Sequence, residues 1–92
     1  MTRYLTRVEL HDADGAAYSQ LHKAMEAKGF SRTILGSDDE VYRLPTAEYL
    51  METTQTRAQV YALAKAAAES TKLGYWIITV DYGNATFKLA KV

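Results

Sequence analysis

Hydrophobic residues follow six successive patterns along these 92 residues, in the order strand, helix, strand, strand, helix, strand. The first pattern runs from Arg3 to His11, where Tyr4 and its alternate neighbours point one way while Arg7 and its alternates point the other. Such alternation is typical of a strand with one buried face. The order of the six patterns limits the possible folds more than any single motif does.

Capping residues mark the two helices. Asp12 or Asp14 can accept the free amide hydrogens at the start of the first helix. Thr56 and Gln59 form a capping-box pattern before the second helix, which is rich in alanine. The glycines expected to follow the two helix ends are Gly29 and Gly74.

The remaining patterns predict strands. Residues 31–36 and 41–51 are expected to form a hairpin around the turn at Gly36, Ser37, Asp38 and Asp39. Pro45 lacks the amide hydrogen that a ladder needs, so the second of these strands should bulge or lose a partner there. Residues 86–91 alternate as a short fifth strand after a turn at 83–84.

The strand predicted over residues 75–82 has apolar side chains on both faces. Trp76, Ile78 and Val80 share one face, and Tyr75 and Ile77 share the other. We assign the first set to the protein core. The second set is then expected on the open face of the sheet, beside the arginines of the first strand.

This order predicts an α+β chain with one domain over residues 1–92, a ferredoxin-like βαββαβ sandwich with a short extra C-terminal strand. Both helices cover one face of the sheet and leave the other face open. The expected core is Tyr4, Val8, Leu10, Leu21, Met25, Val60, Leu63, Trp76, Ile78 and Val80. The expected open face is Arg3, Leu5, Arg7, Glu9, His11, Tyr75, Ile77, Thr79 and Asp81. Because this open face is partly apolar, we expect a homodimer or a ligand to cover it.

Composition excludes several classes of protein. Eleven basic and eleven acidic side chains cancel, so any RNA contact needs a local basic patch. The chain has no cysteine, which excludes disulfides, thiolate metal sites and a cysteine nucleophile. No apolar run reaches the length of about 18 residues that suggests a membrane span, and Met1 to Leu10 lacks a signal-peptide core. We therefore expect a cytoplasmic protein that does not contact a membrane.

Arg3 and Arg7 project from the same face of the first strand, about 13 Å apart. Guanidinium groups match phosphate oxygens, so this pair is a candidate RNA-binding site. The alternative is an ion pair with Glu9 or Asp81. His11 titrates near neutral pH when unperturbed and is the candidate general base, although a histidine that only ends a strand is the alternative interpretation.

Other polar residues point to ordinary surface structure. Asp38, Asp39 and Glu40 supply the oxygen ligands that Mg²⁺ or Ca²⁺ prefers, but consecutive turn residues diverge, which favours a solvated loop. His22 is explained as part of a polar helix surface. The sequence contains no phosphate-binding glycine loop and no zinc-ligand spacing, so we predict neither a metal nor a small-molecule cofactor.

The stretch from Lys72 to Val80 is similar to the aromatic strand of RNA-recognition domains, in which rings stack on bases. The spacing differs, and Tyr75 alone is expected to face the open side. Tyr75 is therefore a candidate RNA-binding residue.

Three segments resemble a known family: RVELHDA from Arg7 to Ala13, GFSRTI from Gly29 to Ile34, and LPTAEY from Leu44 to Tyr49. Over most of its length the chain resembles the GhoS-like family, which includes the endoribonuclease antitoxin of type V toxin–antitoxin systems and related small proteins. The resemblance implies a ferredoxin-like fold, related to that of small CRISPR-associated nucleases. It also implies cleavage of a toxin's messenger RNA.

If the activity is shared, the expected chemistry is a metal-independent transesterification of the RNA backbone. His11 is the candidate base that deprotonates the 2′-hydroxyl, while Arg3, Arg7 and Arg32 would stabilise charge on the phosphate. No family motif assigns active-site residues to positions in this chain, so these roles rest on side-chain chemistry alone.

The alternative is a non-catalytic homodimer that binds RNA or a protein through the same sheet or its edge. The zero net charge and the outward apolar residues Leu5 and Ile77 favour this alternative.

Overall fold

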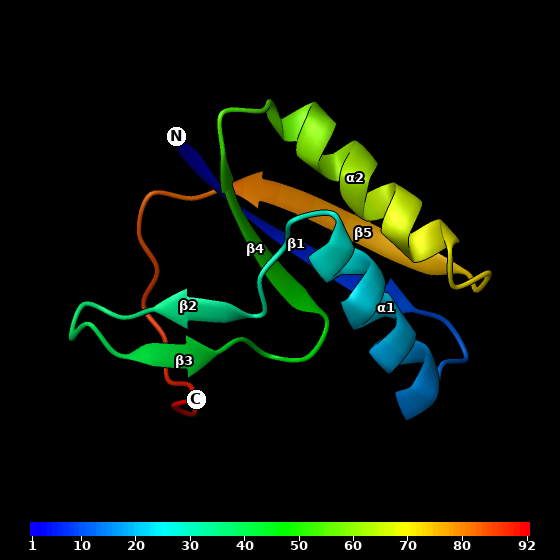
Figure 1. Cartoon of the computed structure of the whole chain (residues 1–92), viewed down its shortest axis with the longest axis horizontal. Helices are drawn as coiled ribbons and strands as arrows, with labels where there is room; N and C mark the ends of the chain where they lie inside the picture. Colours follow the sequence, from blue (N-terminus) through cyan, green and yellow to red (C-terminus); the bar gives the residue numbers. More distant parts are fainter.

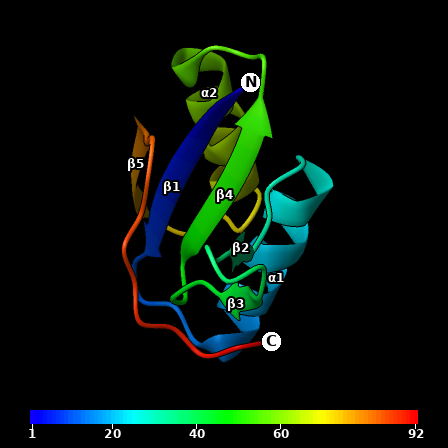
Figure 2. The same cartoon turned by 90° about the vertical axis from the view of Figure 1, so that its left-hand side faces the viewer.

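β1 (Thr2–Leu10) is the central strand of the main sheet, with β4 (Glu48–Thr53) on one side and β5 (Tyr75–Asp81) on the other (Figure 1). Both neighbours run antiparallel to β1. In the computed structural model, which describes residues 1–92, helices α1 (Gly15–Ala27) and α2 (Arg57–Glu69) cover one face of this sheet. Figure 2 shows the opposite face, which no helix covers.

A hairpin of β2 (Thr33–Leu35) and β3 (Val41–Arg43) forms a second, separate antiparallel sheet. One isolated bridge, between Ser31 and Leu50, joins the start of this hairpin to β4. The α+β class is therefore confirmed, with two helices and five strands in two antiparallel sheets. The ferredoxin-like order is not confirmed, because the hairpin joins β4 only through that single bridge.

The strand predicted over residues 41–51 is broken at Pro45. The N–H of Glu48 donates to the carbonyl of Pro45 at 3.1 Å, and Ala47 between them has a φ of 73°. A tight turn thus separates β3 from β4. Proline cannot donate to a ladder, so the break occurs where the sequence predicted a lost pairing.

Both helices begin at predicted caps. The carboxylate of Asp14 accepts the N–H of Ala17 at 2.9 Å, which places the start of α1 after the second of the two candidate aspartates. Thr56 and Gln59 form the predicted capping box of α2. Gly29, with a φ of 97°, follows the end of α1 as expected.

The end of α2 differs from the prediction. Lys72, with a φ of 62°, is the residue in the left-handed conformation, and Gly74 is not. Gly74 instead lies against His11, where an added Cβ would be 3.0 Å from the imidazole Nδ1. Gly74 therefore permits a close approach to His11, and the left-handed residue that follows α2 is Lys72.

The core lies between the helices and the inner face of β1 and its neighbours. Alternate residues of β1 are buried as predicted, including Thr6, whose hydroxyl lies 2.8 Å from that of Thr79. The large core cluster comprises Tyr4, Val8, Leu10, Leu21, Met25, Phe30, Tyr49, Met51, Val60, Ala64, Ala67 and Ala68.

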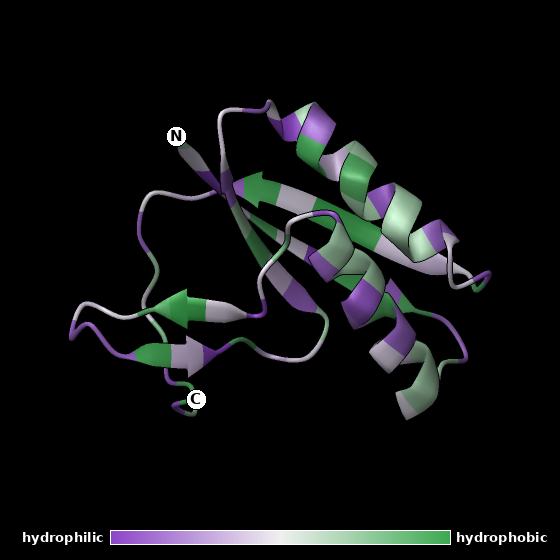
Figure 3. Ribbon diagram, in the orientation of Figure 1, coloured by the Kyte–Doolittle hydropathy of each residue, from purple (hydrophilic) through white to green (hydrophobic).

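The facing of β5 contradicts the prediction. Trp76, Ile78 and Val80 lie on the open face and are 70%, 59% and 40% exposed, whereas Tyr75 and Ile77 pack against the core. Hydropathy could not reveal this, because apolar residues occur on both faces of the strand (Figure 3). The three residues assigned to the core are thus on the surface, and the two assigned to the open face are inside.

The C-terminal segment, residues 82–92, is not a regular strand. It leaves the end of β5, crosses to the hairpin and meets β3 at an isolated bridge between Tyr42 and Lys91 (Figure 2). The N–H groups of Arg43 and Val92 donate to the carbonyls of Ala90 and Val41, at 2.9 and 3.1 Å. The predicted fifth strand over residues 86–91 is reduced to these contacts.

Candidate functional site

The open face of the sheet carries an apolar row between two charged rows. Cross-strand pairing places Leu5 between Leu50 of β4 and Val80 of β5. On either side of this row, Arg3 pairs with Glu52 and Arg7 pairs with Glu48. Each of the two predicted arginines is therefore opposite a carboxylate, which lowers the positive potential of this face.

Arg7 forms an ion pair with Glu48 at 3.4 Å. An ion pair was predicted, but with Glu9 or Asp81. Glu48 is the partner instead, because β4 lies beside β1. Asp81, one of the predicted partners, pairs with Arg57 of α2 at 3.1 Å. Both pairs are largely exposed, and exposed pairs contribute only about 0.2–1 kcal/mol each to stability.

Arg3 is held by the start of the C-terminal segment. Its guanidinium lies 5.6 Å from the centre of the Tyr82 ring and donates to the carbonyl of Gly83. Burial raises the pKa of Tyr82, an effect that Arg3 opposes, so the phenol is neutral at physiological pH. Arg3 and Tyr82 together form a cationic and aromatic surface at one end of β1.

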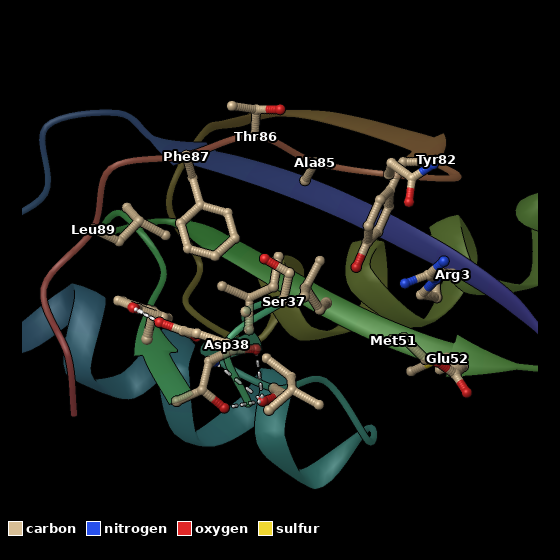
Figure 4. Close-up of a pocket in the computed structure, with 18 of the residues that line it drawn as sticks. Arg3, Ser37, Asp38, Met51, Glu52, Tyr82, Ala85, Thr86, Phe87 and Leu89 are labelled. Atoms are coloured by element: carbon tan, nitrogen blue, oxygen red, sulfur yellow. Dashed lines mark hydrogen bonds between the residues drawn. The ribbon is translucent and has the colours of Figure 1, made fainter. Parts of the chain in front are cut away.

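This surface borders a cavity of about 980 Å³. Arg3, Leu50 and Glu52 of the sheet line its floor, the hairpin lines one side, and the C-terminal segment lines the other. The rings of Tyr82 and Phe87 point from the C-terminal segment toward the hairpin (Figure 4). We call this cavity the strap groove, because residues 82–92 pass over the open face along it.

The middle of the C-terminal segment has free backbone groups. No intramolecular backbone hydrogen bond involves residues 84–89, while the bonds of Tyr82, Ala90 and Val92 hold the two ends. One aromatic contact lies between these ends, where the rings of Phe87 and Tyr42 meet edge to face at 5.2 Å. The groove wall is therefore anchored at few points and presents unused donors and acceptors.

His11 lies on the open face, in contact with Trp76. Their rings are 5.0 Å apart and nearly perpendicular, and the His11 N–H donates to the carbonyl of Gly74 at 2.8 Å. His11 is absent from the lining of the strap groove, as is Arg7. The structure therefore keeps the two predicted catalytic residues on one face but outside the cavity.

Two other predicted RNA-binding residues lie away from the groove. Tyr75 packs on the inner side of β5, and its hydroxyl donates to Glu69 at 3.2 Å. Arg32 lines a smaller cavity of about 510 Å³ together with Arg43 and Glu26. The predicted set of Arg3, Arg7, Arg32 and Tyr75 is thus not gathered in one site.

His22 has a partner that the sequence did not reveal. Its Nδ1 lies 2.6 Å from the hydroxyl of Tyr49, a fully buried core residue. Burial, and secondly the nearby charge of Arg32, lower the pKa of His22 from its usual value of 6.5. Burial raises the pKa of Tyr49, so its hydroxyl keeps its proton in this hydrogen bond.

The acidic turn of the hairpin is organised internally. Asp38 accepts hydrogen bonds from the Tyr42 hydroxyl at 2.6 Å and from the Glu40 N–H at 3.0 Å. These bonds lower the pKa of Asp38, and the first of them raises the pKa of Tyr42. No group of three or more histidine, aspartate or glutamate side chains converges in a metal-binding arrangement. Neither helix has the length and hydrophobicity of a membrane span.

Sequence reasoning missed most of the strap groove. Tyr82, Phe87 and Lys88 line it, and none of them was a candidate before the structure. The only signal in the sequence is the alternation over residues 86–91, which predicts a strand there. No family model and no curated protein matches this chain in sequence comparison.

Proposed function

We propose that this protein is a ferredoxin-like domain that binds single-stranded RNA in the strap groove. The observation that carries the proposal is the contact of the Arg3 guanidinium with the Tyr82 ring in the lining of this cavity. Proteins bind single strands by stacking bases on aromatic rings and by placing cations along the backbone. The groove offers both kinds of group, with Lys88 as its second cation.

The free backbone of residues 84–89 supports the same proposal. Its amide and carbonyl groups can bond to base edges and hydroxyls without breaking any bond inside the protein. The 980 Å³ cavity also exceeds what one side chain or a few water molecules fill.

The charges of the groove predict weak binding with a shallow salt dependence. Glu52 and Asp38 line the cavity together with Arg3 and Lys88, so net attraction for phosphate is small. Two cationic contacts give a slope of roughly −1.4 in the logarithm of the association constant against the logarithm of salt concentration.

Fluorescence anisotropy with a labelled single-stranded RNA tests the proposal. Tyr82→Leu removes a stacking ring and should weaken binding by about 1–3 kcal/mol, or roughly 5- to 150-fold. The matched control Tyr61→Leu removes an exposed ring on α2, outside the groove, and should bind like the unmodified protein. Equal affinities of the two variants, no binding, or binding that ignores salt would contradict the proposal.

An endoribonuclease that cleaves a toxin's messenger RNA is the second candidate, as the resemblance to the GhoS-like family suggests. The supporting observation is that Arg7 and His11 both lie on the open face of the sheet. In this mechanism His11 takes the 2′-hydroxyl proton, the 2′-oxygen displaces the 5′-oxygen from phosphorus to form a 2′,3′-cyclic phosphate, and the leaving 5′-oxygen takes a proton from water. Arg7 leaves Glu48 and stabilises the charge on the phosphate.

Incubation of purified protein with RNA, with and without a chelator, tests cleavage. Arg7→Ala should abolish it while circular dichroism stays native, because the ion pair with Glu48 is exposed. Cleavage by this variant at the unmodified rate would exclude the assigned role. Encoding of a small membrane-spanning toxin next to this protein would favour the antitoxin function.

A further inference from the structure

We infer that the free edge of β5 is the interface of a homodimer, in which β5 pairs antiparallel with β5 of a second copy. The strand is seven residues long and lies at the edge of the main sheet. This surface is separate from the strap groove, so the inference is independent of RNA binding.

The hydrogen bonds of β5 show which backbone groups are free. Gly74 accepts from the N–H of His11, and the N–H of Tyr82 donates to Arg3, so even-numbered residues are bonded to β1. Bonded and non-bonded pairs alternate in an antiparallel ladder. The N–H and C=O groups of Tyr75, Ile77, Thr79 and Asp81 therefore point to the free edge.

One symmetric register uses every residue of the strand. With the two-fold axis at Ile78, Tyr75 lies opposite Asp81 of the second copy and Ile77 lies opposite Thr79. In these pairs, residues whose backbone N–H and C=O groups point to the free edge lie opposite each other, so they can hydrogen-bond. Moving the axis to Ile77 or Thr79 leaves two residues of the strand without a partner.

The same register buries the exposed apolar residues of β5. Trp76 of one copy lies opposite Val80 of the other on the open face, and the two Ile78 side chains meet on the axis. These three residues are 70%, 40% and 59% exposed in the single chain. Pairing therefore converts three exposed apolar side chains per copy into one continuous apolar stripe across the axis.

Charges on the inner side of the edge are complementary in this dimer. Asp81 holds Arg57 at 3.1 Å, and Tyr75 holds Glu69 at 3.2 Å. Because Asp81 lies opposite Tyr75 of the second copy, Arg57 of one copy approaches Glu69 of the other. The contact occurs twice, once on each side of the axis.

Apart from Asp81 at its end, the edge has none of the features that keep edges from pairing. Between Tyr75 and Asp81 there is no lysine, arginine, proline or glycine, and the strand is regular. The C-terminal segment makes no backbone hydrogen bond to β5. On the opposite edge of the sheet, β4 is partly covered by the bridge to Ser31.

Sedimentation equilibrium of the full chain tests the dimer. We expect a dimer, and Ile78→Lys should make it a monomer because two ammonium groups would meet on the axis. The control Leu35→Lys changes an apolar residue of β2 that is 64% exposed, and should leave the dimer intact. Circular dichroism checks that both variants fold.

A charge exchange identifies the partner as a second copy in this register. Arg57→Glu and Glu69→Arg each place like charges at both contacts and should weaken the dimer roughly tenfold. An equimolar mixture of the two variants pairs opposite charges again and should restore association. A monomeric unmodified protein, a dimer that survives Ile78→Lys, or a mixture no stronger than its components would overturn the inference. RNA binding by Tyr82→Leu is measured separately, so the two proposals can fail independently.

Discussion

Two parts of the molecule are built in different ways. The first, here called the body, consists of β1, α1, β4, α2 and β5. The second, here called the periphery, consists of residues 31–46 with the hairpin and residues 82–92. Of the fifteen buried residues of the protein, only Leu44 belongs to the periphery. The periphery nevertheless supplies most of the strap groove.

Stability comes mainly from the body, whereas the groove proposed to bind RNA comes mainly from the periphery. Burial of apolar surface is the dominant favourable term in folding, and nearly all of it lies in the body. The periphery is held by a few backbone bonds and by the contact between Tyr42 and Phe87. Substitutions in the groove should therefore change binding with little effect on folding, and substitutions in the body should do the opposite.

The largest expected effect compares one leucine from each part. Leu21 is fully buried in α1, and Leu21→Ala should lower the free energy of unfolding by about 2–5 kcal/mol through lost burial and a cavity. Leu35→Ala in the hairpin should change it by less than about 0.5 kcal/mol. Urea denaturation followed by circular dichroism measures both. Similar losses for the two variants would mean that the periphery shares the core of the body.

A smaller effect compares two residues in the left-handed conformation. Lys72, in the loop that joins α2 to β5 of the body, and Asp39, in the periphery, both have φ values of 62°. Lys72→Gly should raise the free energy of unfolding by about 1 kcal/mol, because glycine adopts this conformation without steric strain. Asp39→Gly should leave it almost unchanged, since the hairpin contributes little and aspartate tolerates the conformation better. Denaturation curves that show a larger gain in unfolding free energy for Asp39→Gly than for Lys72→Gly would contradict this distinction.

The smallest expected effect is a pH dependence within the body. The pKa of His22 is lowered in the folded protein, so between that value and 6.5 the unfolded chain binds more protons. The stability that His22 contributes is therefore present above pH 6.5 and lost as the pH falls through the folded pKa. His22→Gln should give a flatter profile of unfolding free energy between pH 7 and pH 5. Identical profiles for the two proteins would exclude this contribution, and NMR titration of the His22 ring would locate its pKa.

Features fixed by neighbouring residues could be predicted from the sequence. Asp14, Thr56 and Gln59 cap helices through contacts with residues three positions away, so the local pattern contains the whole interaction. The facing of β1 was equally clear, because its charged residues all fall on one side. In β5 both sides are apolar, and only packing against α2 decides which side is buried.

The groove depends on contacts between distant parts of the chain. Arg3 meets Tyr82, and Tyr42 meets Phe87, across separations that no local pattern encodes. The prediction that Arg3 and Arg7 share a face was confirmed, but it could not show that Glu52 and Glu48 lie opposite them. Which residues lie opposite one another in a sheet depends on the strand order, and only the structure supplied that order.

The position of the single tryptophan has a practical consequence for spectroscopy. Trp76 is already mostly in water in the folded chain, with the ring of His11 against one edge of it. Its emission should therefore change little when an isolated chain unfolds, and fluorescence would be a poor reporter of folding. A shift of this emission to shorter wavelength with rising protein concentration would instead report that something apolar has come to lie over the edge of the sheet.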